Sequence, residues 1–222
     1  MKILILLHSN ILNDARVIRQ ANAVAEIGDV ILFSKTSSSS KRLESLDKKV
    51  KVQNFVYPQS MRQKLLKHTF IHREYDFMFN LLLQNNDHFD YCIANDLPCL
   101  RTATLLKQKG LTEKIVYDAH EIYPETIKQF FPGQSNMPKL KRLLIRFLTH
   151  FMVNRAVAYE HKAIKQCDQV MTVNNALADY FAKQYAIKNQ ALCVAFLIYL
   201  KPKCGKPLVF ISNINGKIRM LF

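Results

Sequence analysis

The first 120 residues alternate between short apolar runs and helical patterns. Lys2–Leu7 is a nearly continuous apolar run, which is typical of a strand buried on both faces of a parallel sheet. Residues 14–27 follow with apolar positions at helical spacing, and Gly28 stands where such a helix should stop. The same patterns predict further strands and helices. The strands are expected at 29–34, 49–57, 89–94 and 114–118, and the helices at 61–85 and 98–109.

This order of elements predicts an α/β fold with a doubly wound parallel sheet, Rossmann-like, because parallel strands must be joined by crossover connections. After Pro138 the pattern predicts a long helix over 139–167, a sixth strand over 168–173 and a helix over 174–184. Sheets of this kind bind ligands beyond the carboxyl ends of their strands. We therefore expect a functional site in the loops at residues 8–14, 95–98 and 119–125.

The net charge indicates an anionic partner. Lys and Arg number 32 against 17 Asp and Glu, which gives +15, and this balance suits nucleic acid, an anionic membrane surface or a phosphorylated substrate equally. Nucleic acid is disfavoured because the basic residues are not clustered with stacking aromatic residues and no helix-turn-helix or RNP-like pattern occurs.

No apolar run reaches the ~17–20 residues of a membrane-spanning helix, and the apolar start of the chain lacks the cleavage site of a signal peptide. We therefore expect a cytoplasmic protein.

The densest group of candidate chemistry follows the strand predicted at 114–118. Asp118, His120, Glu121 and Glu125 stand within a few residues of each other at the expected ligand edge. His120 is the natural candidate for a general base, because imidazole titrates near neutral pH. The alternative is that His120 caps the strand and bonds to backbone while the carboxylates are solvated. A metal-dependent hydrolase fits less well, because adjacent strand residues point in alternating directions and the His-x3–5-His spacing of a metal site is missing.

A second group follows the first strand. Asp14 is predicted to cap the helix after it, since its carboxylate can accept a first-turn amide proton. Arg16 and Arg19 then lie one turn apart near a helix N-terminus, where anions are favoured. Neither GxGxxG nor GxxxxGK[ST] occurs, so the dinucleotide fingerprint and the P-loop are excluded.

The third group is an apolar stripe with basic residues in the helix expected after Pro138. Residues 139–155 carry Lys and Arg around the stripe, and a basic amphipathic helix of this kind can lie on an anionic bilayer. The alternative is a core helix with a solvated basic face. The stripe consists of Leu140, Leu143, Leu144, Phe147, Leu148 and Phe151.

Together these stretches resemble the N-terminal half of a bacterial family 4 retaining glycosyltransferase of the two-domain GT-B fold. The resemblance covers roughly residues 2–190, and its most specific part is the string YDAHEIYPE at 117–125. The weaker matches are residues 3–7, NDARV at 13–17, IANDLP at 93–98 and the stretch 159–174.

The resemblance implies transfer of a sugar from a nucleotide-sugar donor to an envelope, lipid-linked or polysaccharide acceptor, with retention at the anomeric carbon. His120 matches the family's conserved histidine near the reacting centre, and the loop at residues 8–16 matches a ligand-binding loop. Such enzymes usually need no metal or other cofactor, which agrees with the lack of a DxD motif. With His120 as the catalytic residue, we expect substrate contacts from Asn13, Asp14, Arg16, Asp96, Asp118, Glu121 and Glu125.

One departure from the family concerns the donor-binding domain. Members carry a second domain with a Glu-x7-Glu motif, whereas no acidic residue follows Asp179 here. We therefore expect residues 1–192 to form the glycosyltransferase-like domain and 193–222 to be an atypical basic tail of a truncated or frameshifted product. On this interpretation activity is weak or needs a separate chain that supplies the donor domain, and residues 139–155 hold the protein on the inner face of the cytoplasmic membrane. The rival hypothesis is a non-enzymatic module that binds anionic lipid or nucleic acid.

Overall fold

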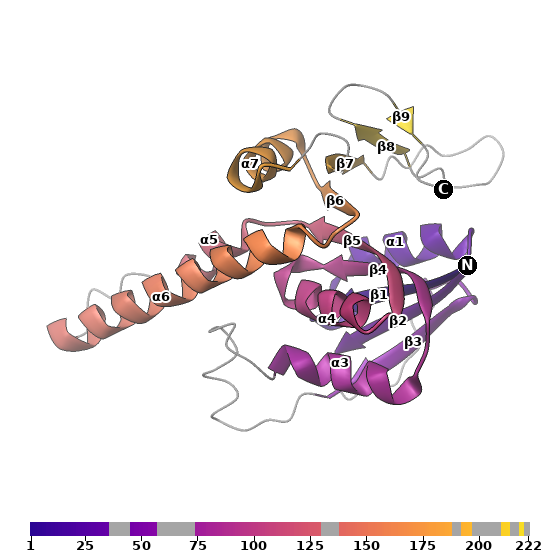
Figure 1. Cartoon of the computed structure of the whole chain (residues 1–222), viewed down its shortest axis with the longest axis horizontal. Helices are drawn as coiled ribbons and strands as arrows, with labels where there is room; N and C mark the ends of the chain where they lie inside the picture. Colours follow the sequence, from indigo (N-terminus) through magenta and orange to yellow (C-terminus); the bar gives the residue numbers. More distant parts are fainter. Residues whose placement is uncertain are drawn as a thin grey trace.

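One mixed sheet organises the protein in the computed structural model (Figure 1). The structure describes residues 1–35, 45–56, 74–129, 138–187, 192–196, 210–213 and 218–219, and within them the strand order is β3-β2-β1-β4-β5-β6-β7-β8-β9. The parallel strands are β1 (Lys2–Leu7), β2 (Asp29–Lys35), β3 (Val50–Phe55), β4 (Phe89–Asn95), β5 (Thr112–Ala119), β6 (Gln169–Thr172) and β7 (Leu192–Phe196). The antiparallel strands are β8 (Phe210–Asn213) and β9 (Ile218–Arg219).

Helices follow β1, β3, β4, β5 and β6, and with the parallel strands they confirm the doubly wound α/β fold. The direction in which strands are added reverses between β1 and β4, and such a switch point is where open α/β sheets bind ligands. The described helices are η1 (Ile11–Asn13), α1 (Ala15–Ala25), α3 (Glu74–Asn85), α4 (Asp96–Gln108), α5 (Tyr123–Gln129), α6 (Lys139–Ile164) and α7 (Asn175–Tyr185).

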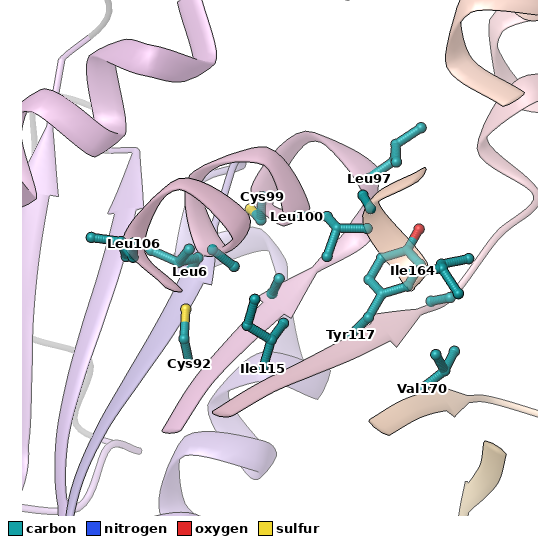
Figure 2. Close-up of a cluster of buried hydrophobic side chains, with 14 of the residues drawn as sticks. Leu6, Cys92, Leu97, Cys99, Leu100, Leu106, Ile115, Tyr117, Ile164 and Val170 are labelled. Atoms are coloured by element: carbon teal, nitrogen blue, oxygen red, sulfur yellow. The ribbon is translucent and has the colours of Figure 1, made fainter. Parts of the chain in front are cut away.

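The apolar run of β1 is continuous because both faces of the sheet are covered. Ile3 and Ile5 belong to a core cluster that includes Val17 of α1, whereas Leu4 and Leu6 belong to a second cluster on the other face. Successive side chains of a strand point to opposite faces, so each face receives every second residue. The second cluster draws in α3, α4, α6 and α7, and Figure 2 shows part of it.

Two helices differ from the expectation. α4 begins at Asp96, two residues before Pro98, because the first four N–H groups of a helix have no intrahelical partner and proline loses nothing there. α5 was not predicted: its first three residues fall in the loop expected at 119–125, and its other four were assigned to no element. Of the helix predicted over 61–85, residues 61–73 lie outside the described part. The strand β7 pairs with β6, and the domain boundary at residue 192 stays a prediction.

A carboxylate lies inside the core between β5, α6 and α7. Glu160 is 1% exposed and accepts hydrogen bonds from the hydroxyls of Tyr117, at 2.6 Å, and Tyr185. Burial raises the pKa of Glu160, the two tyrosine hydrogen bonds lower it, and the net result is a pKa of about 7. The buried carboxyl of Glu160 therefore changes its charge near neutral pH.

The predicted N-terminal cap of α1 is confirmed, and its contribution to stability can be measured. The Asp14 carboxylate accepts a hydrogen bond from the Val17 amide at 3.2 Å. Asp14→Ala should lower the free energy of unfolding by about 1 kcal/mol, because a first-turn N–H then loses its partner. Urea denaturation measures this loss. Asp14→Asn, which keeps the acceptor, should lose only a fraction of it, and an equal loss for both variants would contradict the cap as the cause.

Candidate functional site

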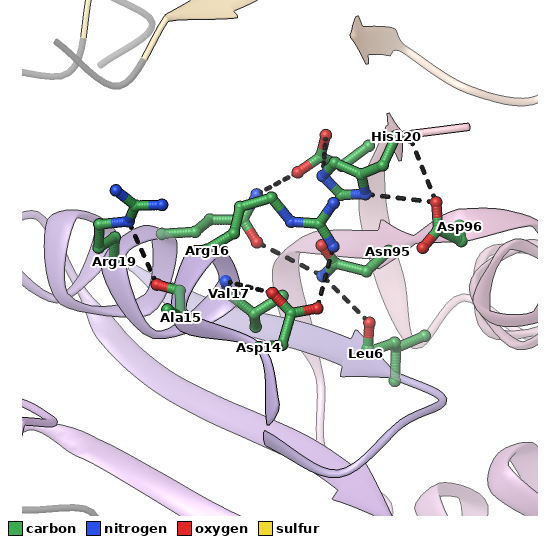
Figure 3. A network of polar contacts seen from close by, with 11 residues as sticks. Leu6, Asp14, Ala15, Arg16, Val17, Arg19, Asn95, Asp96 and His120 are labelled. Carbon is green, nitrogen blue, oxygen red and sulfur yellow. Dashed lines mark hydrogen bonds and ion pairs between the residues drawn. The ribbon is translucent and has the colours of Figure 1, made fainter. Parts of the chain in front are cut away.

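Polar side chains gather at the carboxyl ends of β4 and β5, beside the switch point (Figure 3). Asn95 ends β4, Asp96 opens α4, and His120 follows the last residue of β5. The apolar strands hold these residues in place because their backbone is fixed by the ladders between β1, β4 and β5. We call His120, Asp96, Asp118, Gln20 and Asn95 the His120 cluster.

The imidazole of His120 lies between two carboxylates. Its Nε2 is 3.0 Å from Asp118 Oδ1 and its Nδ1 is 3.3 Å from Asp96 Oδ1. The backbone N–H of His120 also donates to Asp96 Oδ1, at 3.2 Å. The side chains of His120 and Asp118 are 8% and 6% exposed, so water screens this arrangement little.

This geometry determines the charge of His120. Burial by itself lowers the pKa of His120, but hydrogen bonds and charge from Asp118 and Asp96 outweigh burial and raise the pKa to about 9. At neutral pH both ring nitrogens therefore carry protons and face carboxylates. The arrangement favours a fixed imidazolium that orients and donates, and it differs from the general base expected from the sequence.

Two amides that the sequence analysis missed support the cluster. Gln20 Nε2 donates to Asp118 Oδ2 at 2.6 Å, and Asn95 Nδ2 donates to Leu6 O at 3.2 Å and to Gln20 Oε1 at 3.4 Å. Asn95 is 1% exposed, and its Oδ1 has no hydrogen-bond partner among the described residues. One sign of this arrangement was available in the sequence: Gln20 is a polar residue at a position of α1 that the helical pattern turns towards the core.

Asp96 adopts a backbone conformation that few side chains tolerate. Its φ is 62°, in the left-handed region that Asn and Asp enter more readily than most residues. The same carboxylate oxygen contacts both the backbone and the ring of His120. Such conformations persist where the surroundings over-determine them, and they concentrate at functional sites.

A basic and an acidic side chain border the His120 cluster. Arg16 Nη2 pairs with Asp14 Oδ2 at 3.0 Å, and the Nε of Arg16 has no hydrogen-bond partner among the described residues. The pKa of Glu121 is raised by burial, with a contribution from Asp96, and is lowered in part by Thr126, His120 and Arg16. Arg16 and the residues of the His120 cluster therefore both influence the pKa of the Glu121 carboxyl group.

The other predicted site residues lie differently. The Glu125 carboxylate pairs with Lys128 at 2.7 Å on the surface of α5. Asn13 ends η1, just before the cap of α1. Arg19 is exposed, and its Nε donates to the carbonyl of Ala15 at 3.2 Å. In the part of the chain that the structure describes, no three His, Cys, Asp or Glu side chains are arranged to hold a metal ion.

The chemistry of this edge suits a ligand that is both hydroxylated and anionic. Carboxylates and amide oxygens accept hydrogen bonds from hydroxyl groups, and Asp96 keeps part of its carboxylate accessible. A guanidinium beside a helix N-terminus attracts phosphate oxygens, and Arg16 lies in the first turn of α1. Acceptors for hydroxyl groups and a guanidinium for phosphate therefore lie together beside His120.

Comparisons with known proteins give a distant structural likeness. No protein-family model and no curated protein matches the chain. The chain is similar to a UGT transferase from Siraitia grosvenorii solved in complex with UDP, with a TM-score of 0.46, 10% identity, and 89% of this chain and 51% of that one covered. It is also similar to a UDP-glucosyltransferase from Polygonum tinctorium capable of glucosylating indoxyl, with a TM-score of 0.44, 10% identity, and 93% and 50% covered. The chain thus spans about half the length of these two proteins.

Proposed function

We propose that the chain belongs to a sugar-transferring enzyme and binds its substrates at the carboxyl edge of β4 and β5. The observation that carries the proposal is the His120 imidazolium held between Asp96 and Asp118 at the switch point of the sheet. The resemblance of the string at 117–125 to family 4 glycosyltransferases supports the same assignment. The donor is a nucleotide sugar, and the acceptor is a glycan or a lipid-linked molecule of the cell envelope.

The roles follow from the charges and the hydrogen-bonding groups. Asp96 and Glu121 accept hydrogen bonds from sugar hydroxyls, and Arg16 with the first turn of α1 attracts the donor phosphates. His120 keeps Asp96 in place and supplies positive charge where negative charge develops on the departing phosphate. Retention at the anomeric carbon and the family 4 assignment belong to this proposal.

The test is calorimetric titration of the protein with UDP-, GDP- and ADP-sugars, followed by an assay of sugar transfer. One nucleotide sugar should bind more tightly than its free nucleoside diphosphate, because the diphosphate lacks the transferred sugar, whose hydroxyls donate hydrogen bonds to the carboxylates. Arg16→Ala should weaken binding about tenfold or more, since a hydrogen bond to a charged group contributes about 1.5–3 kcal/mol.

Arg19→Ala is the matched control, because Arg19 lies on the same helix and donates to its own backbone. It should leave binding unchanged. The proposal is wrong if both arginine variants weaken binding equally and heparin displaces the nucleotide sugar. The protein would then bind anions through its net charge alone.

A further inference from the structure

The N-terminal half of α6 presents apolar side chains to solvent. Leu140 is 80% exposed and Phe147 is 66% exposed, values far from those of core residues. Only the C-terminal half of the helix is buried against the body of the protein, through Met152, Ala156 and Glu160 on the opposite side, and residues 139–151 include no buried side chain. In Figure 1 this half of α6 projects away from the sheet.

The exposed residues form a single face. Their spacing of three, four and seven residues places them on one side of a helix. The structure thus decides against the alternative in which this stripe is buried in the core. We call the face the α6 apolar face; it consists of Leu140, Leu143, Leu144, Phe147, Leu148 and Phe151.

The surroundings of this face are basic. The sequence from Lys139 to Tyr159 contains no acidic residue, and the guanidinium of Arg155 lies 5.7 Å from the centroid of the Phe151 ring. Long basic side chains beside apolar ones can keep their charges in the headgroup layer while their stems cover the acyl boundary. The exposed basic residues of this stretch are Lys139, Lys141, Arg142, Arg146 and Arg155.

We propose that α6 lies on an anionic lipid bilayer, with the α6 apolar face inserted at the boundary between headgroups and acyl chains and the basic residues around it contacting lipid phosphates. A second copy of the chain fits this face less well, because pairing two such faces brings together the basic residues at their edges, Lys141 and Arg155, with no acidic residue from 139 to 159 to offset them. An anionic bilayer supplies the opposite charge and the apolar layer together. The helix is peripheral: within the described residues, no helix is long and apolar enough to cross a membrane. This proposal stands independently of sugar transfer.

Flotation of the whole protein with lipid vesicles tests the docking. The protein should bind vesicles of phosphatidylglycerol and phosphatidylcholine, should bind phosphatidylcholine alone much more weakly, and should be released by salt. Phe147→Ser should lower partitioning about tenfold or more, because a buried phenyl ring is lost from the bilayer. Lys141→Gln, at the edge of the α6 apolar face, should lower it about fivefold, the effect of one basic residue near an anionic surface.

Matched controls come from other parts of the surface. Leu83 on α3 is 40% exposed, so Leu83→Ser removes an exposed leucine away from α6 and should leave partitioning unchanged. Lys109→Gln removes an exposed charge after α4 and should change it little. Far-ultraviolet circular dichroism of each variant verifies that the fold is retained.

Fluorescence gives a readout that general charge attraction would not move. The chain contains no tryptophan, so Phe147→Trp places a single indole in the α6 apolar face and Leu83→Trp places one outside it. Emission from the first should shift to shorter wavelength with phosphatidylglycerol vesicles, and emission from the second should not. Unshifted emission from Phe147→Trp, or partitioning of Phe147→Ser equal to that of the unaltered protein, overturns the proposal. A dimer that Phe147→Ser dissociates, without vesicle binding, overturns it in favour of a second copy.

Discussion

Replacing His120 by alanine is expected to abolish most sugar transfer and to destabilise the fold. The imidazolium lies between Asp96 and Asp118, so its removal leaves buried negative charge without a partner. Breaking a buried ion pair in this way costs about 3–5 kcal/mol of unfolding free energy. Loss of a positioned charge or proton donor at a reacting centre lowers the rate by a factor on the order of 10²–10⁴. Urea denaturation and a transfer assay measure the two effects separately.

A double variant separates the role of His120 in catalysis from its role in stability. His120→Ala combined with Asp118→Asn removes the uncompensated charge, while the amide can still accept the hydrogen bond that Gln20 donates to Asp118. The double variant should recover much of the lost stability and none of the lost transfer. Recovery of transfer together with stability would show that His120 acts only by holding the fold together.

The charge of His120 adds a pH dependence with a definite sign. Its pKa is raised from 6.5 to about 9 in the fold, so its contribution to stability is complete below pH 6.5 and is lost as pH rises through about 9. The ring should therefore be protonated at pH 7.5, which histidine NMR shifts report directly.

Glu160→Gln is expected to remove a large part of the pH dependence of stability below pH 6.5. The pKa of Glu160 is raised from 4.5 to about 7 by burial, so the folded state holds a proton that the unfolded chain releases. Its stabilising effect is complete below pH 4.5 and is lost as pH rises towards 7. The unaltered protein should lose about 2–3 kcal/mol more between pH 4.5 and 6.5 than Glu160→Gln does. Urea denaturation across this range measures the difference.

The range ends at pH 6.5 because His120 adds its own pH dependence above that value, where the unfolded chain releases the histidine proton and the folded protein keeps it. Glu125→Gln changes a glutamate on the surface of α5 and should follow the curve of the unaltered protein. Tyr117→Phe removes a hydrogen bond that lowers the pKa of Glu160, so the loss of stability with pH should extend to higher pH. Parallel curves for the unaltered protein and Glu160→Gln would contradict a buried titrating carboxyl.

Much of the candidate site was visible in the sequence. The loops after β1, β4 and β5 follow from apolar strand patterns, and these loops supplied Asp14, Asp96 and His120. Gln20 was missed, and Asn95 was placed only as part of the loop expected at 95–98, because a single amide in an apolar helix or strand gives no local sign of what it contacts. Their partners lie on distant stretches: Gln20 bonds to Asp118 and Asn95 bonds to Leu6.

The sequence by itself determined the doubly wound sheet and the capped start of α1, because hydrophobic period and capping chemistry are local properties. Only the tertiary structure decided the charge of His120, since that charge depends on carboxylates brought from the ends of two strands. It also decided that the stripe on α6 faces solvent. An apolar stripe has the same spacing whether it meets a core or a bilayer, and only the position of the helix in the fold, with its N-terminal half beyond the packed body, distinguishes the two.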